Sequence, residues 1–342
     1  MSILISVIIP LFNAADWIGA TIASACAQTH RELQIIVVDD GSTDAGAAIV
    51  DELARHDSRI TLIRQPNGGV ARARNAGIDA AVGAFIAPLD ADDLWSPRKL
   101  ELQLDTLERA PADTALAYNW FRRIDANDRV LAGSPHPRVE GSVFARHLDW
   151  NFISNGSTPL VRSEVARDIR YDPALRDAGN EGTEDYLFQL QVARHHRFVC
   201  APYFLTGYRA LPHSMGAAPL RMARSHLQTF ATIARDAPPE ARAIIDRRSA
   251  GYRLAIAGML ARQRDPRFIA ALTRLLFSRP QTLAEAALRR GRTKPEPAWL
   301  GATSTPFAEH DIASPDGPWQ TRRSPALLAR LAELDAQAVP VA

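Results

Sequence analysis

Short runs of β-branched residues alternate with segments of helical periodicity between Ile3 and Phe121, and this alternation constrains the fold more than any other feature. The first run, ILISVIIP, is apolar apart from Ser6 and rich in β-branched residues, which is typical of a strand buried on both faces. Later runs of the same character are LQIIVVDD, ITLIRQ, AFIAPL and TALAYNWF. Strands that alternate with helices at this spacing imply right-handed βαβ crossovers. We therefore predict an α/β fold, with a mostly parallel twisted sheet flanked by helices.

Polar residues precede the helical segments and predict where these helices begin. Their side chains can accept hydrogen bonds from the free N–H groups of a first helical turn. We expect caps at Asn13 for a helix over 15–28, at Ser42 or Thr43 for a helix that ends near His56, and at Ser96, followed by Pro97, for a helix that ends near Arg109.

Unusual polar residues follow each of the first four strands, where parallel sheets bind ligands. After these strands come, in order, Pro10, Phe12 and Asn13; Asp39 and Asp40; Asn67, Gly68 and Gly69; and Asp90, Asp92 and Asp93. Because the carboxyl ends of parallel strands meet at one edge of a sheet, the sequence predicts a binding site at that edge.

The segment FIAPLDADDLW places three carboxylates within four residues, at Asp90, Asp92 and Asp93. A solvated Asp-rich turn would explain them without any ligand. The alternative is a divalent cation, because Mg²⁺ and Mn²⁺ prefer carboxylate oxygen and take only one or two carboxylates from a protein. The position after a buried strand, together with the second acidic pair Asp39–Asp40, favours a cation held by Asp90 and Asp92.

The segment NGGVARARNAG joins a glycine turn to two arginines. Gly68 and Gly69 permit a tight turn whose amides would suit a phosphate. Arg72 and Arg74 lie two apart on a predicted helix, so they cannot both face one ligand. We favour Arg74 for a structural or substrate-facing role, with Arg72 almost as good a candidate. The chain has neither a Walker A nor a G-x-G-x-x-G pattern, so the phosphate fingerprints of P-loop and dinucleotide-binding proteins are missing.

Glu184 and Asp185 stand at the start of a predicted helix, after Gly179 and Gly182. Acidic residues are stabilised there by the helix dipole, which by itself accounts for most such pairs. The glycines, however, suit a loop that closes over a substrate. A carboxylate held in such a loop could accept a proton from an attacking hydroxyl. Both interpretations stay open at this point.

Taken in order, these segments resemble the family 2 inverting glycosyltransferases of the GT-A fold. The resemblance covers residues 3–215. It rests on SVIIPLFN, VVDDGSTD, NGGVARARNAG and FIAPLDADDLW, and on TED at 183–185, which is similar to the block that carries the family's base. It implies a GT-A-type sheet and inverting, metal-dependent transfer of a sugar from a nucleotide sugar, expected to be a UDP-sugar, to an acceptor hydroxyl.

The resemblance also implies roles for single residues on the donor side. Pro10 and Phe12 would line the base pocket, Asp40 would hydrogen-bond a uracil, and Asp39 would support that loop; Asn67, Arg72 and Arg74 would contribute to donor binding. Asp90 would lie near the ribose and the Mn²⁺ or Mg²⁺ ion, Asp92 would be the main metal ligand, and Asp93 would brace the turn.

On the acceptor side the resemblance makes Asp185 the general base, with Glu184 as its neighbour. Residues 153–160, ISNGSTPL, are expected to line the acceptor. His213 lies further along than the Tyr-Arg-x-His pattern of the family would place it, and a surface histidine is the simpler interpretation. The Q-x-x-R-W motif of the processive synthases is missing, which favours addition of a single sugar.

From about Met215 the pattern is helical and rich in Ala and Arg, with no further strand signal. We expect a GT-A nucleotide-sugar-binding catalytic domain over 1–215 and a helical, basic extension over 216–342, loosely ordered over 290–325, with a last helix near 326–337. Nine Arg or Lys residues fall between Arg262 and Lys294 against two acidic residues. A helix packed on its own domain explains them; peripheral contact with an anionic membrane or glycolipid through 262–294 is the alternative.

Charge and composition limit the partners and the location. The formal net charge of +2 gives no indication of a nucleic-acid partner. Cys26 and Cys200 are too few for a disulfide framework, which fits a reducing cytosol. No apolar run approaches the roughly 20 residues of a membrane span. We expect a cytoplasmic protein, at most peripheral at the inner face of the cytoplasmic membrane.

The function predicted is therefore transfer of a sugar to a glycan or glycolipid acceptor in the synthesis of a bacterial surface polysaccharide. One alternative is a non-catalytic nucleotide-sugar-binding module, in which Asp185 would be dispensable. Another is a sugar-nucleotide pyrophosphorylase, but the G-x-x-x-R-x-x-P-x-x-K run expected of that class is missing after Pro10.

Overall fold

The computed structural model of the chain describes residues 3–131, 135–211, 218–278, 302–313, 321 and 323–337. His213 lies outside the described residues, as do 290–301, 314–320 and 322 of the segment predicted to be loosely ordered.

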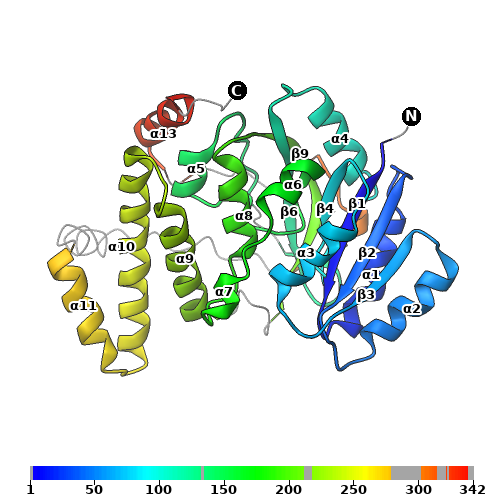
Figure 1. The fold of residues 1–342 in the computed structure, drawn as a ribbon, viewed down its shortest axis with the longest axis horizontal. Helices are drawn as coiled ribbons and strands as arrows, with labels where there is room; N and C mark the ends of the chain where they lie inside the picture. The colour runs from blue at the N-terminus through cyan, green and yellow to red at the C-terminus, as the bar shows by residue number, and fades with distance from the viewer. Residues whose placement is uncertain are drawn as a thin grey trace.

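The N-terminal part alternates strand and helix, as the sequence predicts (Figure 1). Its elements are β1 (Ile5–Leu11), α1 (Ala15–Cys26), β2 (Leu33–Asp39), α2 (Gly46–His56), β3 (Ile60–Arg64), α3 (Val70–Ala80) and β4 (Phe85–Pro88). The middle of the chain adds β5 (Leu94–Trp95), α4 (Lys99–Glu108), β6 (Thr114–Ile124), β7 (Arg129–Leu131), α5 (Phe144–Asp149), β8 (Leu160–Arg162), α6 (Ser163–Ile169), α7 (Ala174–Asp177), α8 (Glu184–Ala193) and β9 (Arg197–Arg209). The last part holds α9 (Pro219–Ala234), α10 (Pro239–Arg262), α11 (Arg267–Ser278), β10 (Ala302–Pro306), the 3-10 turn η3 (Phe307–Glu309) and α13 (Pro325–Gln337).

The strands form one ten-stranded sheet within the described residues. Its order is β10-β7-β6-β8-β4-β1-β2-β3, with β9 beside β6 and β5 beside β9. The strands β4, β1, β2 and β3 are parallel to one another, whereas β8 runs antiparallel to both β4 and β6. The α/β fold is therefore as predicted, but the sheet is parallel only in its first half and mixed beyond β4.

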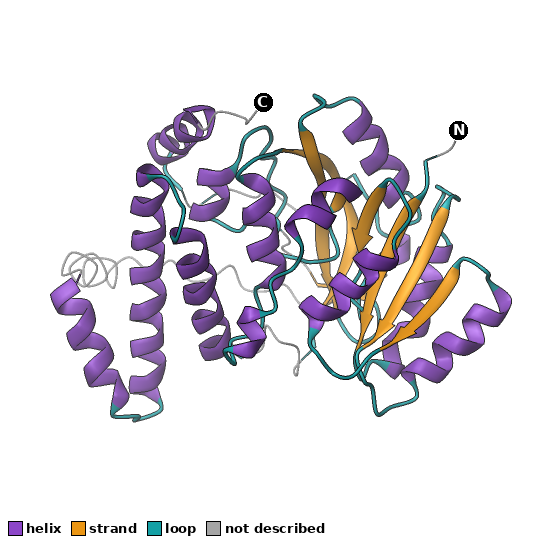
Figure 2. Ribbon diagram, in the orientation of Figure 1, coloured by secondary structure: helices purple, strands orange, loops and turns teal. Residues whose placement is uncertain are grey.

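Both faces of β1 are buried, which explains why its sequence is apolar without alternation. Ile5, Val7 and Ile9 belong to a core shared with residues of α1, α2 and α4, while Ile8 belongs to a second core shared with residues of α3, α6 and α8. Figure 2 shows helices on both sides of the strands, the layered arrangement of an α/β domain.

The C-terminal helices pack on the opposite side of the molecule from β3 (Figure 1). In this group α9 contacts α8, and α10 contacts α5, α9 and α11. The buried Asp335 of α13 accepts a hydrogen bond from the backbone N–H of Ala145 and pairs with Arg146, both on α5. The division of the chain near residue 215 stays a prediction. No helix within the described residues has both the length and the apolar character that crossing a membrane requires.

The structure corrects the expectation that no strand follows Met215. The segment 302–306, ATSTP, pairs antiparallel with β7, with Ala302 opposite Leu131 and Pro306 opposite Arg129. It is an edge strand, and an edge strand needs no apolar run because only part of it is buried. The two- and three-residue strands β5, β7 and β8 are too short to show a pattern in the sequence.

The predicted helix caps are also wrong. Asn13 has φ +49°, and its side chain accepts a hydrogen bond from Thr43 N instead of capping α1. The carboxylate of Asp44 accepts from both Ala15 N at 2.8 Å and Gly46 N at 2.9 Å, so one side chain serves the first residues of α1 and α2. Because this partnership joins two loops, a search for caps within one segment misses it. At α4 it is the backbone oxygen of Ser96, not its side chain, that accepts from Lys99 N.

Candidate active site

The register of the parallel strands brings the predicted site residues to one edge of the sheet. Leu11, at the end of β1, lies opposite Asp39 of β2, and Ile8 lies opposite Pro88 of β4. The polar residues that follow these strands must therefore emerge side by side. Phe12 is 52% exposed there, which leaves an apolar ring in solvent beside Asp39 and Asp40. Pro10 is half-buried on the same strand.

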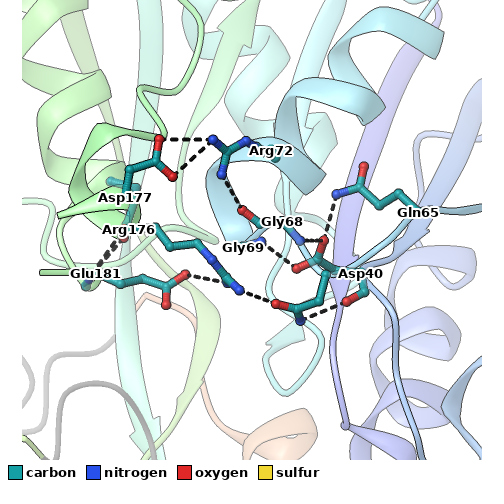
Figure 3. Close-up of polar contacts among 11 residues, drawn as sticks. Asp40, Gln65, Gly68, Gly69, Arg72, Arg176, Asp177 and Glu181 are labelled. Atoms are coloured by element: carbon teal, nitrogen blue, oxygen red, sulfur yellow. Dashed lines mark hydrogen bonds and ion pairs between the residues drawn. The ribbon is translucent and has the colours of Figure 1, made fainter. Parts of the chain in front are cut away.

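Asp40 is the centre of a cradle of amide groups (Figure 3). Its carboxylate accepts hydrogen bonds from the backbone N–H groups of Gly68 and Gly69 and from Gln65 Nε2, each at 2.7 Å. Two of these bonds end on Oδ1 and one on Oδ2, so within the described residues Oδ2 keeps a lone pair for a further donor. Asp39 Oδ1 accepts from Ser42 N at 3.0 Å, which is the loop-supporting position expected of it.

A second set of contacts ties this cradle to the loop that leads to α8 (Figure 3). The guanidinium of Arg176, at α7, donates to Asn67 Oδ1 and lies 3.5 Å from Glu181 Oε1. Arg72 pairs with Asp177 at 3.0 Å and donates to Gly68 O. Residues 174–181 are thus held against residues 67–69, although more than a hundred residues separate them.

Gly69 is a backbone position that this contact requires. It has φ +89° and ψ 163°, a region that is essentially limited to glycine, and a Cβ there would lie 2.3 Å from Arg176 Cδ and 2.7 Å from its Nη1.

We predict that Gly69→Ala lowers the free energy of unfolding by about 2–4 kcal/mol, from backbone strain together with the clash. Urea unfolding of the wild type and the variant measures this difference in the free energy of unfolding. The control is Gly179→Ala, since Gly179 has φ +70° but nothing within 4 Å of its added Cβ, so only strain should appear. Part of the loss should return in an Arg176→Ala background. If the two variants lost the same free energy of unfolding, and Arg176→Ala restored none of the loss at Gly69, the clash with Arg176 would be contradicted.

Arg72 and Arg74 point to different surroundings, as their spacing predicts. Arg72 is exposed, whereas Arg74 is 4% exposed and its Nη2 lies 2.5 Å from Asp90 Oδ1. Gly156 packs closely against this ion pair: an added Cβ there would lie 2.9 Å from Arg74 Nη2 and 3.1 Å from Asp90 Oδ2. The backbone N–H of Asp90 donates to Ser157 Oγ at 3.0 Å. The segment 153–160 therefore packs directly on the acidic cluster.

Asp93 is fully buried and braces the turn, in line with its predicted role. It accepts hydrogen bonds from Ser157 Oγ at 2.6 Å and from the backbone N–H of Arg209 at 2.9 Å. Burial raises the pKa of Asp93 well above its usual range, and the charges of Asp92 and Asp90 raise it further. Arg209, itself 1% exposed, donates Nε–H to Asp92 O at 2.7 Å and lies 4.3 Å from the centre of the Trp17 ring.

Within the described part of the chain, Asp92 is the carboxylate of the cluster without a side-chain partner. It is half-buried, and no side chain among the described residues donates to its carboxylate, whereas Asp90 has Arg74 and Asp93 has Ser157. Burial, and after it the charge of Asp90, raise the pKa of Asp92 to about 6. A carboxylate in this state is stabilised by an added cation.

The residues present fit a Mg²⁺ or Mn²⁺ ion that draws most of its ligands from elsewhere. Within the described part of the chain, no group of three or more His, Cys, Asp or Glu residues could hold a metal by itself. Ions of this kind need only one or two carboxylates when water and substrate phosphates complete the shell. Asp92 and Asp90 supply that number.

A chain of contacts brings the start of α8 close to this cluster. The Phe188 ring of α8 stacks on Tyr171 at 4.4 Å, and Tyr171 lies 5.0 Å from the guanidinium of Arg74, which pairs with Asp90. Asp185 is one turn before Phe188 and on a similar side of the helix. Burial lowers the pKa of Arg74, but the charges of Asp90, Tyr171 and Asp185 outweigh it and raise the pKa overall.

Glu184 and Asp185 have different surroundings. Glu184 is 3% exposed, and both of its carboxylate oxygens lie 3.0 Å from Gly182 N, so it closes its own loop. Burial raises the pKa of Glu184 to about 7. Asp185 is half-buried; Oδ1 accepts from Tyr186 N at 2.8 Å, and burial raises the pKa of Asp185 while Arg74 lowers it.

Sequence reasoning missed several residues of this site. Tyr208 of β9 lies among the acidic groups: burial raises its pKa, and the charges of Asp93, Asp90, Asp92 and Asp185 add to the rise. Tyr208 and Arg209 come a few residues before His213, the residue that the family pattern singled out in the sequence. They lie at the acidic cluster because β9 pairs with β5, the short strand that directly follows it. Arg176 has no signal in the sequence, whereas Gly156 lies within 153–160, the segment expected to line the acceptor.

Comparison with known proteins agrees with this geometry. The family model for glycosyl transferase family 2 matches residues 6–161. The uncharacterized glycosyltransferase EpsJ of Bacillus subtilis is 37% identical over 234 residues, which cover 66% of this chain and 67% of that protein.

The chain belongs to glycosyl transferase family 2. Among solved structures, the family 2 chain resembles Staphylococcus aureus TarS 1-349 in complex with UDP-GlcNAc, with a TM-score of 0.61, 19% identity and 80% of each chain covered. It also resembles the mannosyltransferase PcManGT of Pyrobaculum calidifontis in complex with GDP-Man and Mn²⁺, with a TM-score of 0.56, 21% identity, and 85% and 81% of the two chains covered. These likenesses show the GT-A fold that the sequence predicts.

The match is short in some relatives. The chain covers only 20% to 23% of the length of three glycosyltransferases from Rickettsia species. The substrates and partners of the whole family 2 protein are therefore a matter for proposal.

Proposed function

We propose that this protein transfers one sugar, with inversion, from a nucleotide-sugar donor to an acceptor hydroxyl, with a divalent cation at Asp92 and Asp90 and with Asp185 as general base. The observation that supports the proposal is the contact chain Phe188–Tyr171–Arg74–Asp90, which links the helix of the proposed base to the carboxylate cluster that also contains Asp92. An acceptor-side base and a donor-side acidic pair would then act on the same pair of substrates.

On the donor side, a UDP-sugar fits the cradle around Asp40. An imide N–H of uracil can donate to the free lone pair of Asp40 Oδ2, and the exposed ring of Phe12 can pack on the base. Asn67, fixed by Arg176, keeps the Gly68–Gly69 turn in place. UDP-GlcNAc in the TarS complex supports a UDP-sugar, and GDP-Man in the PcManGT complex supports the wider class of nucleotide-sugar donors.

On the leaving side, Mn²⁺ or Mg²⁺ bound at Asp92 and Asp90 would offset the charge of a departing nucleoside diphosphate. The protein's own contribution would be to leave the Asp92 carboxylate open to the ion, since Arg74 pairs with Asp90 instead and Arg209 donates only to the backbone oxygen of Asp92. Mn²⁺ in the PcManGT complex supports a metal of this kind.

On the acceptor side, Asp185 would accept the proton of the attacking hydroxyl. The acceptor oxygen forms a bond to the anomeric carbon as the bond to the diphosphate oxygen breaks, so a single displacement inverts the configuration. A pKa raised by burial makes Asp185 a better proton acceptor than an exposed carboxylate. Residues 153–160, packed on Asp90 and Asp93, are in place to line the acceptor.

For the role in the cell we propose synthesis of a bacterial surface polysaccharide or glycolipid at the cytoplasmic face of the membrane. The many arginines of the C-terminal helices support contact with an anionic acceptor or surface.

A thermal-shift panel of UDP-, GDP-, CMP- and dTDP-sugars, each with and without Mn²⁺, tests the proposal. We expect one UDP-sugar to raise the melting temperature only when Mn²⁺ is present, because metal and diphosphate complete each other's ligand shells. A shift of equal size in EDTA, or no preference among the bases, would contradict the proposed donor site.

A further inference from the structure

A groove of about 570 Å³ lies between the first turn of α9 and the end of α10, apart from the catalytic carboxylates. It is lined by apolar side chains and by three arginines. The apolar residues include Pro219, Leu220 and Met259, and the arginines are Arg221, Arg224 and Arg262. We call it the arginine groove. A lining of this kind suits a ligand that is apolar at one end and anionic at the other.

The three arginines carry charge that the described part of the protein leaves largely unneutralised, although Arg224 interacts with Asp265 at longer range. All three are exposed, and none forms an ion pair or side-chain hydrogen bond among the described residues. The nearby acidic residue Asp265 is held by Arg267 at 2.5 Å. Over residues 219–278 there are eleven arginines and four acidic residues, although the whole chain is only +2. The positive charge is therefore local to these helices, where it attracts anions.

The groove adjoins the loop that leads to Asp185. Gly179 lines the groove, and the residues after it run along α9: Asn180 donates to Gln228 Oε1 at 2.8 Å, and Thr183 Oγ1 lies 2.9 Å from Thr229 Oγ1. Arg221 lies seven residues, about two turns, before Gln228, so both are on the side of α9 that faces this loop. A molecule held in the groove would thus lie next to the loop that carries the proposed base.

The neighbouring helix adds an apolar surface. α11 packs against α10, and its residues Ile269, Leu276 and Phe277 are 59%, 52% and 84% exposed. Large apolar side chains exposed beside a cationic groove favour a ligand with an apolar chain over a free anion in solution.

We propose that the arginine groove binds the phosphate of an amphipathic acceptor, a molecule in which a phosphate or diphosphate joins the sugar-accepting end to an apolar chain. Guanidinium groups bind phosphate oxygens through paired, charge-assisted hydrogen bonds, and the apolar lining receives the first part of the chain. This inference rests on the proposed transfer reaction, because it names the class of its acceptor.

Calorimetric titration with monomeric n-dodecyl phosphate, inorganic pyrophosphate and n-dodecyl maltoside tests the ligand class. The test variant is Arg221→Gln/Arg224→Gln/Arg262→Gln. The matched control, Arg253→Gln/Arg264→Gln/Arg274→Gln, removes the same charge from exposed positions outside the groove. We expect n-dodecyl phosphate to bind most tightly, and to lose about ten-fold or more in affinity in the test variant but less than about two-fold in the control.

Three results would overturn the inference. They are equal affinity for pyrophosphate, equal affinity for the uncharged maltoside, or an equal loss of binding in the two triple variants. Binding of UDP with Mn²⁺, measured on the same proteins, reports separately on the donor site. We expect the affinity for UDP to be the same in wild type and both variants. If UDP does not bind, the proposed transfer reaction is contradicted, whereas the result for the groove still stands.

Discussion

Asp185→Asn should lower kcat for sugar transfer by about 10²–10⁴-fold, the usual contribution of a general base, and leave the KM for the donor nearly unchanged. The amide has almost the same shape as the carboxylate and can still accept from Tyr186 N, but it cannot accept the proton of the acceptor hydroxyl. Steady-state transfer assays with the donor found in the thermal-shift panel would measure both parameters.

The control for this change is Glu184→Gln, the adjacent residue of the same loop. Both carboxylate oxygens of Glu184 lie 3.0 Å from the backbone N of Gly182, two residues before it, so we assign Glu184 to the support of the loop. We expect this variant to keep most of the transfer activity. If Asp185→Asn transferred sugar as fast as wild type, the protein would either use another base or be a nucleotide-sugar-binding module without catalysis.

Asp92→Asn should have two effects of opposite sign. Transfer should fall on the order of 10³-fold or more, since charge stabilisation on the leaving side is usually the largest catalytic contribution. In contrast, the metal-free protein should become more stable at pH 8, because the change removes a half-buried negative charge that has no partner among the described side chains.

The pH dependence of the second effect follows from the raised pKa. Asp92 has a pKa of about 6 in the folded state against 3.8 for the unfolded chain, so the folded state binds more protons between these values. Stability from this group therefore falls as the pH rises from 3.8 through 6, and the deficit above pH 6 is on the order of 1–3 kcal/mol. Urea unfolding in EDTA should show Asp92→Asn more stable than wild type by that amount at pH 8, and equal to it near pH 3.5.

Asp90→Asn is the matched control for stability. Asp90 pairs with the buried Arg74 at 2.5 Å, and removing this partner leaves a buried guanidinium without its carboxylate. Loss of one partner of a buried pair destabilises by roughly 3–5 kcal/mol, so this variant should be less stable at pH 8. A destabilised Asp92→Asn protein would show that Asp92, too, has a structural partner, and would count against its role as the free ligand.

Much of the donor-side edge was predictable from the sequence for a simple reason. A strand buried on both faces is apolar over most of its length, so clusters of polar residues mark the ends of β1, β2 and β4, and these clusters hold the predicted site residues. The separation of Arg72 from Arg74 follows in the same way from the 100° advance per helical residue. Such features depend only on neighbouring positions in the chain.

The rest of the site depends on contacts between distant segments. Tyr208 and Arg209 reach the acidic cluster because β9 pairs with the two-residue strand β5, which has no pattern of its own. Arg176 reaches Asn67 through the fold of α7 against the glycine turn, and β10 joins the sheet with a polar sequence. The crowding of three carboxylates after β4 also depends on distant segments: Arg74 pairs with Asp90, and Arg209 donates its backbone N–H to Asp93. Among the described residues, Asp92 is the carboxylate of the three without a side-chain donor.

The most direct test of the account is a crystal grown with UDP and Mn²⁺, with data collected at the manganese absorption edge. The account predicts one anomalous peak within about 2.0–2.3 Å of a carboxylate oxygen of Asp92, close to Asp90 and in contact with the diphosphate. A manganese peak bound elsewhere, or a diphosphate bound at the edge of the sheet with no contact to Asp92, would contradict it.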